Sequence, residues 1–102
     1  MTLAGWLLVV EAHPSATVEA EWNRWYDDVH LPEIAECPGF GEAARYVSQD
    51  DGHRHYITVY ELSGPEAIAT PEFGARRGWA HFSEDVQATV RTYRRIAPPA
   101  EP

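Results

Sequence analysis

The sequence predicts an α+β domain whose elements follow the order strand, helix, strand, strand, helix, strand. Three observations support this order: an amphipathic helix with aromatic residues in 18–40, a hairpin around the Asp-Asp-Gly turn at 50–52, and apolar strand-like runs near both ends. Because crossover connections are right-handed, we expect a four-stranded antiparallel sheet with both helices on one face. The other face would be bare, so we also expect a homodimer paired through this sheet face.

Composition limits both the domain organisation and the partners. With 102 residues, 44% of them hydrophobic, the chain can build one core, which we assign to residues 1–97, followed by a frayed tail at 98–102. A formal charge of −8 makes nucleic acid and anionic membranes poor partners, and the apolar run 3–10 is far shorter than a membrane span. The single Cys37 excludes an intrachain disulfide and suits a cytoplasmic protein.

The β elements are predicted from apolar runs and turn residues. Residues 3–12 are rich in Val and Leu, and 86–96 alternate as a last strand. Residues 40–49 and 53–62 form the hairpin, because Asp50-Asp51-Gly52 accepts positive φ. A two-residue turn at Asp51-Gly52 would place Arg45 and Tyr60 on one face and Tyr46 on the other, but the sequence leaves open which face meets the helices.

The helices are predicted from apolar periodicity and from capping residues. Five residues share about a third of the first helix's circumference, with His30 beside them, namely Val18, Trp22, Trp25, Tyr26 and Val29. Ser15 or Thr17 would cap this helix. Pro32 should end it near His30 and start a second short turn. Residues 63–66 read as a capping box opening a short helix, and Thr70-Pro71 repeats the start signal, with Gly78 closing the second piece.

His30 is the candidate acid/base residue. Asp27 precedes it by one helical turn, and both this carboxylate and a helix C-terminus would raise the imidazole pKa towards or above neutral pH. Two alternatives remain open: His30 capping the last helical carbonyls, and Asp27 pairing with Arg24 on a solvated face.

The aromatic residues suggest a pocket for a planar organic ligand, although an aromatic core would have the same composition. Arg45 is predicted either to hold a phenolate, enolate or carboxylate or to lie at the dimer rim. The other candidate substrate-binding residues are Trp22, Tyr26, Tyr46, Trp79 and Phe82.

Metal and cofactor sites have little support in the sequence. His53 and His55 lie on one side of a predicted strand, with His81 as a further candidate ligand. No carboxylate is an evident additional ligand, so chance placement is the better interpretation. There is no phosphate-binding glycine loop and no nicotinamide or flavin fingerprint. We therefore expect neither a metal nor a cofactor.

One segment carries a family resemblance. The run Trp25-Tyr26-Asp27-Asp28-Val29-His30-Leu31-Pro32-Glu33, with Pro38-Gly39-Phe40 and Tyr60-Glu61-Leu62 after it, resembles the EthD-like branch of the dimeric α+β barrel superfamily. The resemblance implies a ferredoxin-like βαββαβ protomer, paired sheet to sheet into a barrel, with a pocket between helices and sheet that His30 faces. It also implies a cofactor-free enzyme of aromatic or polyketide metabolism.

The resulting hypothesis is a cofactor-independent lyase or isomerase, of the cyclase, dehydratase or lactone-isomerase type, acting on a hydrophobic aromatic or polyketide-like molecule. His30 would move the proton, Asp27 would orient His30, and Tyr60 or Arg45 would stabilise an enolate-like intermediate. The alternatives are a cofactor-free monooxygenase of phenolic substrates and a non-catalytic small-molecule binding protein.

Overall fold

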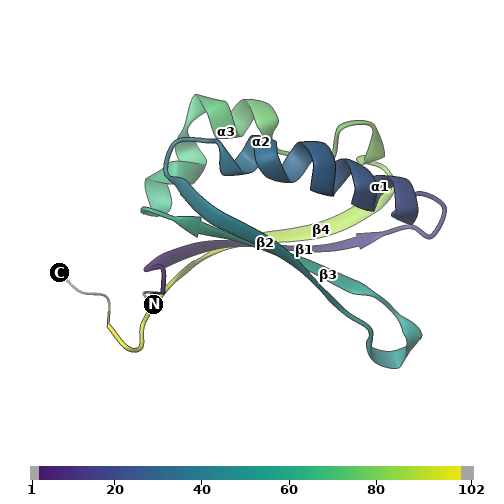
Figure 1. Ribbon diagram of the computed structural model, residues 1–102, viewed down its shortest axis with the longest axis horizontal. Coiled ribbons are helices and arrows are strands. Elements are labelled where there is room, and N and C mark those ends of the chain that lie inside the picture. The colour runs from purple at the N-terminus through teal and green to yellow at the C-terminus, as the bar shows by residue number, and fades with distance from the viewer. Residues whose placement is uncertain (1–2, 100–102) are drawn as a thin grey trace.

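The computed structural model describes residues 3–99 and shows a sheet covered by helices on one face (Figure 1). Its four strands lie in the order β2-β3-β1-β4, and each neighbouring pair is antiparallel. The predicted α+β class, with its ferredoxin-like arrangement, is confirmed. The strands are β1 Trp6–Pro14, β2 Phe40–Ser48, β3 His55–Leu62 and β4 Val86–Arg94, and the helices are α1 Glu19–Trp25, α2 Leu31–Ala35 and α3 Pro71–Arg76.

The β2–β3 hairpin has the register predicted from its turn. Arg45 pairs with Thr58 and Ser48 pairs with His55, as a turn at residues 51 and 52 requires. The chain reverses through a short 3₁₀ turn, Asp50–Gly52, in which Gly52 has a φ of 75°. Thr58 is buried on the face that the helices cover, which answers the question that the sequence left open: Arg45 shares the helix-covered face, and Tyr46 lies on the outer face.

The first helix does not break before Pro32, contrary to the prediction. A π-helical turn, Tyr26–His30, joins α1 directly to α2, and Leu31 keeps helical dihedrals of φ −59° and ψ −49°. The Leu31 N–H donates to the carbonyl of Tyr26, five residues earlier. Pro32 lies in the first turn of α2, where its missing N–H costs little, and the wide π turn gives its ring room beside the preceding carbonyls.

The π turn also changes which side chains face the sheet. Because it holds an extra residue per turn, Val29 rotates out of the predicted apolar stripe and is 42% exposed, whereas His30 is 5% exposed. The start of the helix differs as well: Val18 is the N-cap and makes no side-chain cap bond. The Ser15 and Thr17 hydroxyls contact each other at 3.2 Å instead of capping.

Of the two short helices predicted after the hairpin, only the one that starts at Thr70-Pro71 is confirmed. Thr70 caps α3, since its Oγ1 accepts a hydrogen bond of 3.2 Å from the N–H of Phe73. The capping box predicted at 63–66 is not formed: Pro65–Ala69 is a 3₁₀ turn that begins after Gly64 without a side-chain cap. A further 3₁₀ turn, Ala80–Phe82, leads into β4.

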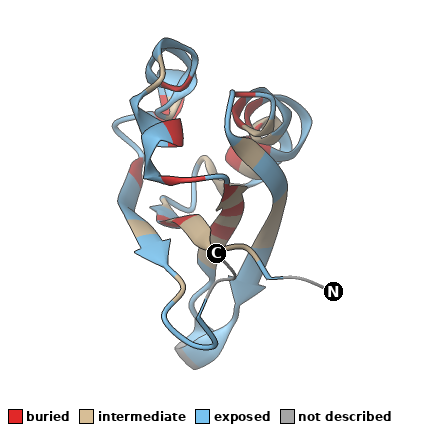
Figure 2. Ribbon diagram, turned by 90° about the vertical axis from the view of Figure 1, so that its left-hand side faces the viewer, coloured by how far each residue is buried: buried red, intermediate tan, exposed pale blue. Residues whose placement is uncertain are grey.

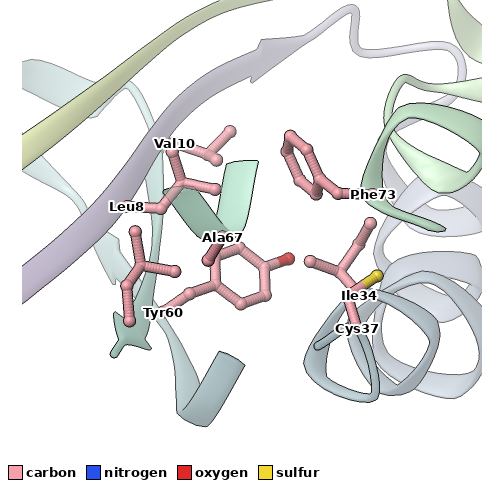
Figure 3. Close-up of a cluster of buried hydrophobic side chains, with 8 residues drawn as sticks. Leu8, Val10, Ile34, Cys37, Tyr60, Ala67 and Phe73 are labelled. Atoms are coloured by element: carbon pink, nitrogen blue, oxygen red, sulfur yellow. The ribbon is translucent and has the colours of Figure 1, made fainter. Parts of the chain in front are cut away.

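The buried residues belong to the helices and to the strands beneath them (Figure 2), while residues that point to the outer sheet face are intermediate or exposed. The buried residues form two clusters. In one, Ile34 of α2 and Phe73 of α3 face Leu8 and Val10 of β1 (Figure 3). The other lies under α1 and the π turn and contains Ala12, Trp22, Tyr26, Phe82 and Val86. The aromatic residues of the first helix therefore belong partly to an ordinary core.

The predicted boundaries fall partly outside the described residues. Residues 1 and 2 of the expected domain and 100–102 of the expected tail are not described, so the division at residue 97 stays a prediction. Within residues 3–99, no helix has the length and apolar character that crossing a membrane requires.

Candidate functional site

A cavity of about 490 Å³ lies between the helices and the β1–β4 side of the sheet. This volume is within the usual range for small-molecule sites, roughly 300–1,000 Å³. Side chains from every layer of the fold border it, and most are apolar. The lining residues are Leu8, Val10, Tyr26, His30, Ile34, Tyr60, Ile68, Phe73, Arg77, Gly78, Trp79, Ala88, Val90 and Thr92.

His30 lies in the wall of this cavity and is held among aromatic rings. Its imidazole stacks on Trp25, with ring centroids 4.6 Å apart and an interplanar angle of 15°. Tyr26 meets it edge-on at 5.0 Å, and Trp79 lies 5.6 Å away. The π turn is responsible for this placement, since it brings His30 rather than Val29 to the inner side of the helix.

The environment of His30 lowers its pKa to about 4, first because burial disfavours the charged ring and second because of the Arg45 charge. The predicted rise of the His30 pKa was wrong for two physical reasons. The helix continues into α2, so His30 does not lie at a carboxyl end. Asp27 is turned away and accepts a hydrogen bond from Arg45 at 2.7 Å. At neutral pH the imidazole is uncharged, so it can accept a proton but has none to give as an imidazolium.

Arg45 connects β2 to the first helix. Its Nη1 donates to Asp27 Oδ1 at 2.7 Å and its Nη2 to Asn23 Oδ1 at 2.8 Å. The guanidinium carbon lies 4.3 Å from the centroid of the Tyr26 ring and 5.0 Å from that of Trp22. The Arg45 side chain is 11% exposed and does not line the cavity. It lies on the helix-covered face behind the aromatic side chains of the cavity wall, and its charge helps to lower the pKa of His30.

Tyr26 and Tyr60 form a buried hydroxyl pair beside the cavity. Their Oη atoms are 3.1 Å apart, and both residues line the cavity. Burial raises the pKa of both phenols, so both stay protonated at neutral pH. One hydroxyl donates to the other, so one phenolic proton is not used within the pair.

The remaining predicted site residues are divided among four places. Trp79 lines the cavity, whereas Trp22 and Phe82 are buried in the second core cluster and do not reach it. Asp27 is exposed beside Arg45. Tyr46 is on the outer sheet face, where it borders a separate hollow of about 740 Å³.

Sequence reasoning missed two polar residues of the cavity. Arg77 follows the end of α3, and Thr92 lies on the inner side of β4. The alternation of the last strand was the one signal that could have indicated Thr92, while the segment containing Arg77 has no periodicity that would place it.

The histidines outside the cavity do not gather into a metal site. His13 and His55 are neighbours on the outer sheet face, with ring centroids 5.1 Å apart. Over the described part of the chain, no group of three or more His, Cys, Asp or Glu side chains could hold a metal ion.

Comparison with known proteins finds likeness in structure and not in sequence. No family model matches the chain, and no curated protein matches its sequence significantly. Among solved structures, SnoaB of Streptomyces nogalater, a cofactor-independent oxygenase, matches with a TM-score of 0.64 and 16% identity over 93% of this chain and 99% of its own. An EthD family protein of Bacillus halodurans gives 0.68 and 12% identity over 89% and 99%. HapK of Hahella chejuensis gives 0.67 and 10% identity over 95% and 98%.

The chain has the fold of these proteins. The ferredoxin-like protomer fold that the sequence resemblance implied is thereby confirmed. At identities of 10–16%, the likeness concerns the backbone arrangement alone.

Proposed function

We propose that the protein is a cofactor-independent enzyme in which His30 removes a proton from a hydrophobic, aromatic or polyketide-like substrate. The observation that carries this proposal is an uncharged, buried imidazole in the wall of a largely apolar cavity of about 490 Å³. A positioned base of this kind contributes about 10²–10⁴-fold to a reaction rate.

The low basicity of His30 restricts the substrate. A base with a pKa of about 4 removes a proton efficiently only from an acidic group, such as a phenol, an enol or a carbon between two carbonyls. The anion formed would lie beside the new imidazolium, and their attraction would raise the pKa of His30 as the proton moves. The phenolic proton that is not used within the Tyr26–Tyr60 pair would donate to the developing oxyanion.

An isomerase or cyclase-type lyase is the first form of the proposal, because the imidazolium could return its proton to a different atom of the same substrate. A dehydratase has less support: it needs an acid for the leaving group, and the two buried tyrosines, with raised pKa values, are poor acids. In either form Asp27 would act at most indirectly, through Arg45.

A cofactor-free monooxygenase is the second candidate, and the names of structural neighbours favour it. SnoaB is described as a cofactor-independent oxygenase, and another neighbour as an antibiotic biosynthesis monooxygenase, with a TM-score of 0.66 and 13% identity over 89% of this chain and 98% of its own. Proton removal by His30 would also be the first step here, since an electron-rich anion reacts with dioxygen more readily than its neutral parent.

The decisive experiment uses His30→Ala and a panel of polycyclic phenols and β-diketones, with product followed by mass spectrometry. We expect turnover to fall by about 10²–10⁴-fold while ligand binding persists. His53→Ala, which changes an exposed histidine of the hairpin, is the matched control and should retain full activity. Unchanged turnover in His30→Ala would remove His30 from the reaction.

Two further readouts separate the alternatives. Turnover under strict anaerobiosis supports the isomerase or lyase and excludes the monooxygenase, whereas oxygen consumption in step with product formation does the opposite. A non-catalytic binding protein would quench its tryptophan fluorescence saturably and form no product. Any product in excess of the protein rules that alternative out.

We also propose that the protein forms a homodimer through its outer sheet face. The registers of the strands bring apolar side chains together at the centre of that face, where Val9 pairs with Val59 and Leu7 with Tyr93. A second copy is the partner that would cover them in a chain of this size.

A further inference from the structure

A single cation borders the cavity. Of its lining residues in the described chain, Arg77 is the one that carries a charge at neutral pH, because His30 is uncharged and no carboxylate is present. The whole chain has 16 Asp and Glu against 8 Lys and Arg, so its surface as a whole repels anions. The lining of the cavity has the opposite sign, and this contrast indicates a preference for a negatively charged ligand.

The backbone after α3 places Arg77 and Trp79 in the lining of the same cavity. The N–H of Arg77 donates to the carbonyl of Phe73 at 2.9 Å, which closes the last turn of the helix. Gly78 then adopts a φ of 102°, a conformation that side-chain-bearing residues avoid, and the chain continues into Trp79. Phe73, Arg77 and Trp79 all line the cavity, so an aromatic ring lies on each side of the cation along the chain.

Among residues 3–99, no hydrogen bond or ion pair of the Arg77 guanidinium is found. Its neighbour Arg76 is engaged, since Nη1 donates to the Glu33 carbonyl at 2.9 Å. Between residues 3 and 99, the ion pairs of the structure are Arg45 with Asp27 and Arg54 with Glu19, and Arg77 takes part in neither. A planar fork of N–H donors is therefore available at the edge of an apolar cavity.

We propose that the cavity binds a flat hydrophobic carboxylate and that Arg77 is the residue that selects it. The carboxylate would accept two hydrogen bonds from the guanidinium, while the ring system lies against Trp79 and Phe73. This deepens the proposed function and rests on it for the cavity being the ligand site. Fixing one end of the ligand at Arg77 would also orient the remainder in the cavity that His30 borders.

A simpler role for Arg77 makes a different prediction. A cation at the end of α3 complements the negative end of the helix without touching any ligand. In that case its replacement would change thermal stability slightly and would leave the choice between charged and neutral ligands unaltered.

The test measures equilibrium binding of naphthalene-2-carboxylate and of its neutral isostere, naphthalene-2-carboxamide, at pH 7.5 by titration calorimetry. The native protein should bind the carboxylate more tightly. Arg77 is exposed, so Arg77→Gln should weaken carboxylate binding by about two- to fivefold, the range for an exposed ion pair, and leave amide binding unchanged. The carboxylate affinity of Arg77→Lys should lie between those of the native protein and of Arg77→Gln, because lysine keeps the charge but lacks the planar fork of N–H donors.

Arg76→Gln is the matched control, since it removes the same charge from the adjacent residue, which does not line the cavity. It should retain the carboxylate preference of the native protein. An unchanged preference in Arg77→Gln, an equal loss in Arg76→Gln, or no binding of either ligand to the native protein would overturn the proposal.

Binding without turnover separates this proposal from the catalytic one. The variant His30→Ala should keep the carboxylate preference even if it loses all activity. If instead His30→Ala were fully active while Arg77→Gln lost the preference for carboxylate, the role of His30 as a base would be refuted. The proposal that the cavity binds a hydrophobic carboxylate would then still be supported.

Discussion

The uncharged state of His30 predicts a specific dependence of stability on pH. In the folded protein its pKa is about 4, against 6.5 for an unperturbed histidine, so between these values the unfolded chain binds a proton that the folded chain does not. The stabilisation is complete above pH 6.5 and is lost as the pH falls towards 4. Replacing the imidazole by a side chain that does not titrate should remove this part of the acid sensitivity.

The magnitude follows from the two pKa values. At about 1.36 kcal/mol for each pKa unit, the full effect below pH 4 is about 3 kcal/mol, and about 2.5 kcal/mol of it is already lost at pH 4.5. The full effect is a large fraction of the stability of a domain of this size, for which roughly 5–15 kcal/mol is the general range, so roughly a fifth to three fifths of that stability depends on one ring staying neutral.

The assay is urea unfolding of the native protein, His30→Gln and the exposed control His53→Gln at pH 7.5 and pH 4.5. The native protein and the control should lose about 2.5 kcal/mol more between these pH values than His30→Gln does. Comparing the pH difference within each variant cancels any cost of the substitution itself. The same loss in all three proteins would refute a neutral, buried His30, and so would an NMR titration of its ring with a midpoint near 6.5.

Three further predictions concern Arg45, the cap of α3 and the proposed dimer. Arg45→Gln removes the cation from the aromatic wall and should cost about 1–3 kcal/mol and raise the pKa of His30; a cost no larger than that of the exposed Arg24→Gln would contradict it. Thr70→Ala should cost about 0.5–2 kcal/mol in urea unfolding through loss of the α3 cap, whereas Ser63→Ala should cost little, and equal costs would show that the cap is unimportant. Sedimentation should find a dimer, and Val59→Arg at the centre of the outer face should give a folded monomer; a dimer that survives this change uses another surface.

Much of the sheet was predictable because its signals are local. The Asp-Asp-Gly turn located the hairpin, and the register that follows if Asp51-Gly52 is a two-residue turn is the one observed, with Arg45 opposite Thr58. The choice of face did not follow, because the helix-covered and outer faces of this hairpin are both partly apolar. Only the packing of the helices on Thr58 and Tyr60 decides it.

The position of the first helix was predicted, but its π-helical turn was not. Pro32 is usually a sign of a helix end, and nothing local in residues 26–30 announces a π turn. The error extended to the chemistry. Once the helix was assumed to stop near His30, a carboxyl end and the Asp27 carboxylate both argued for a charged imidazole, whereas burial and Arg45 give a neutral one.

Tertiary contacts decided which aromatic residues reach the cavity. Trp22 and Tyr26 lie one helical turn apart, yet Trp22 fills the core under α1 and Tyr26 reaches the cavity wall. The sequence did not predict that Arg77 lines the cavity. This position depends on the conformation of Gly78 and on distant segments that form the cavity, whose lining among the described residues includes no acid.

The π turn makes a deletion act differently from a substitution. A substitution of Asp28 alters one exposed side chain, but deletion of its codon would let the segment rewind as an ordinary α-helix. Every apolar side chain would remain in the chain, while the part of the helix before the deletion would turn relative to His30 and α2. In-frame loss of one residue would therefore displace the proposed base from the cavity without changing the identity of any buried side chain.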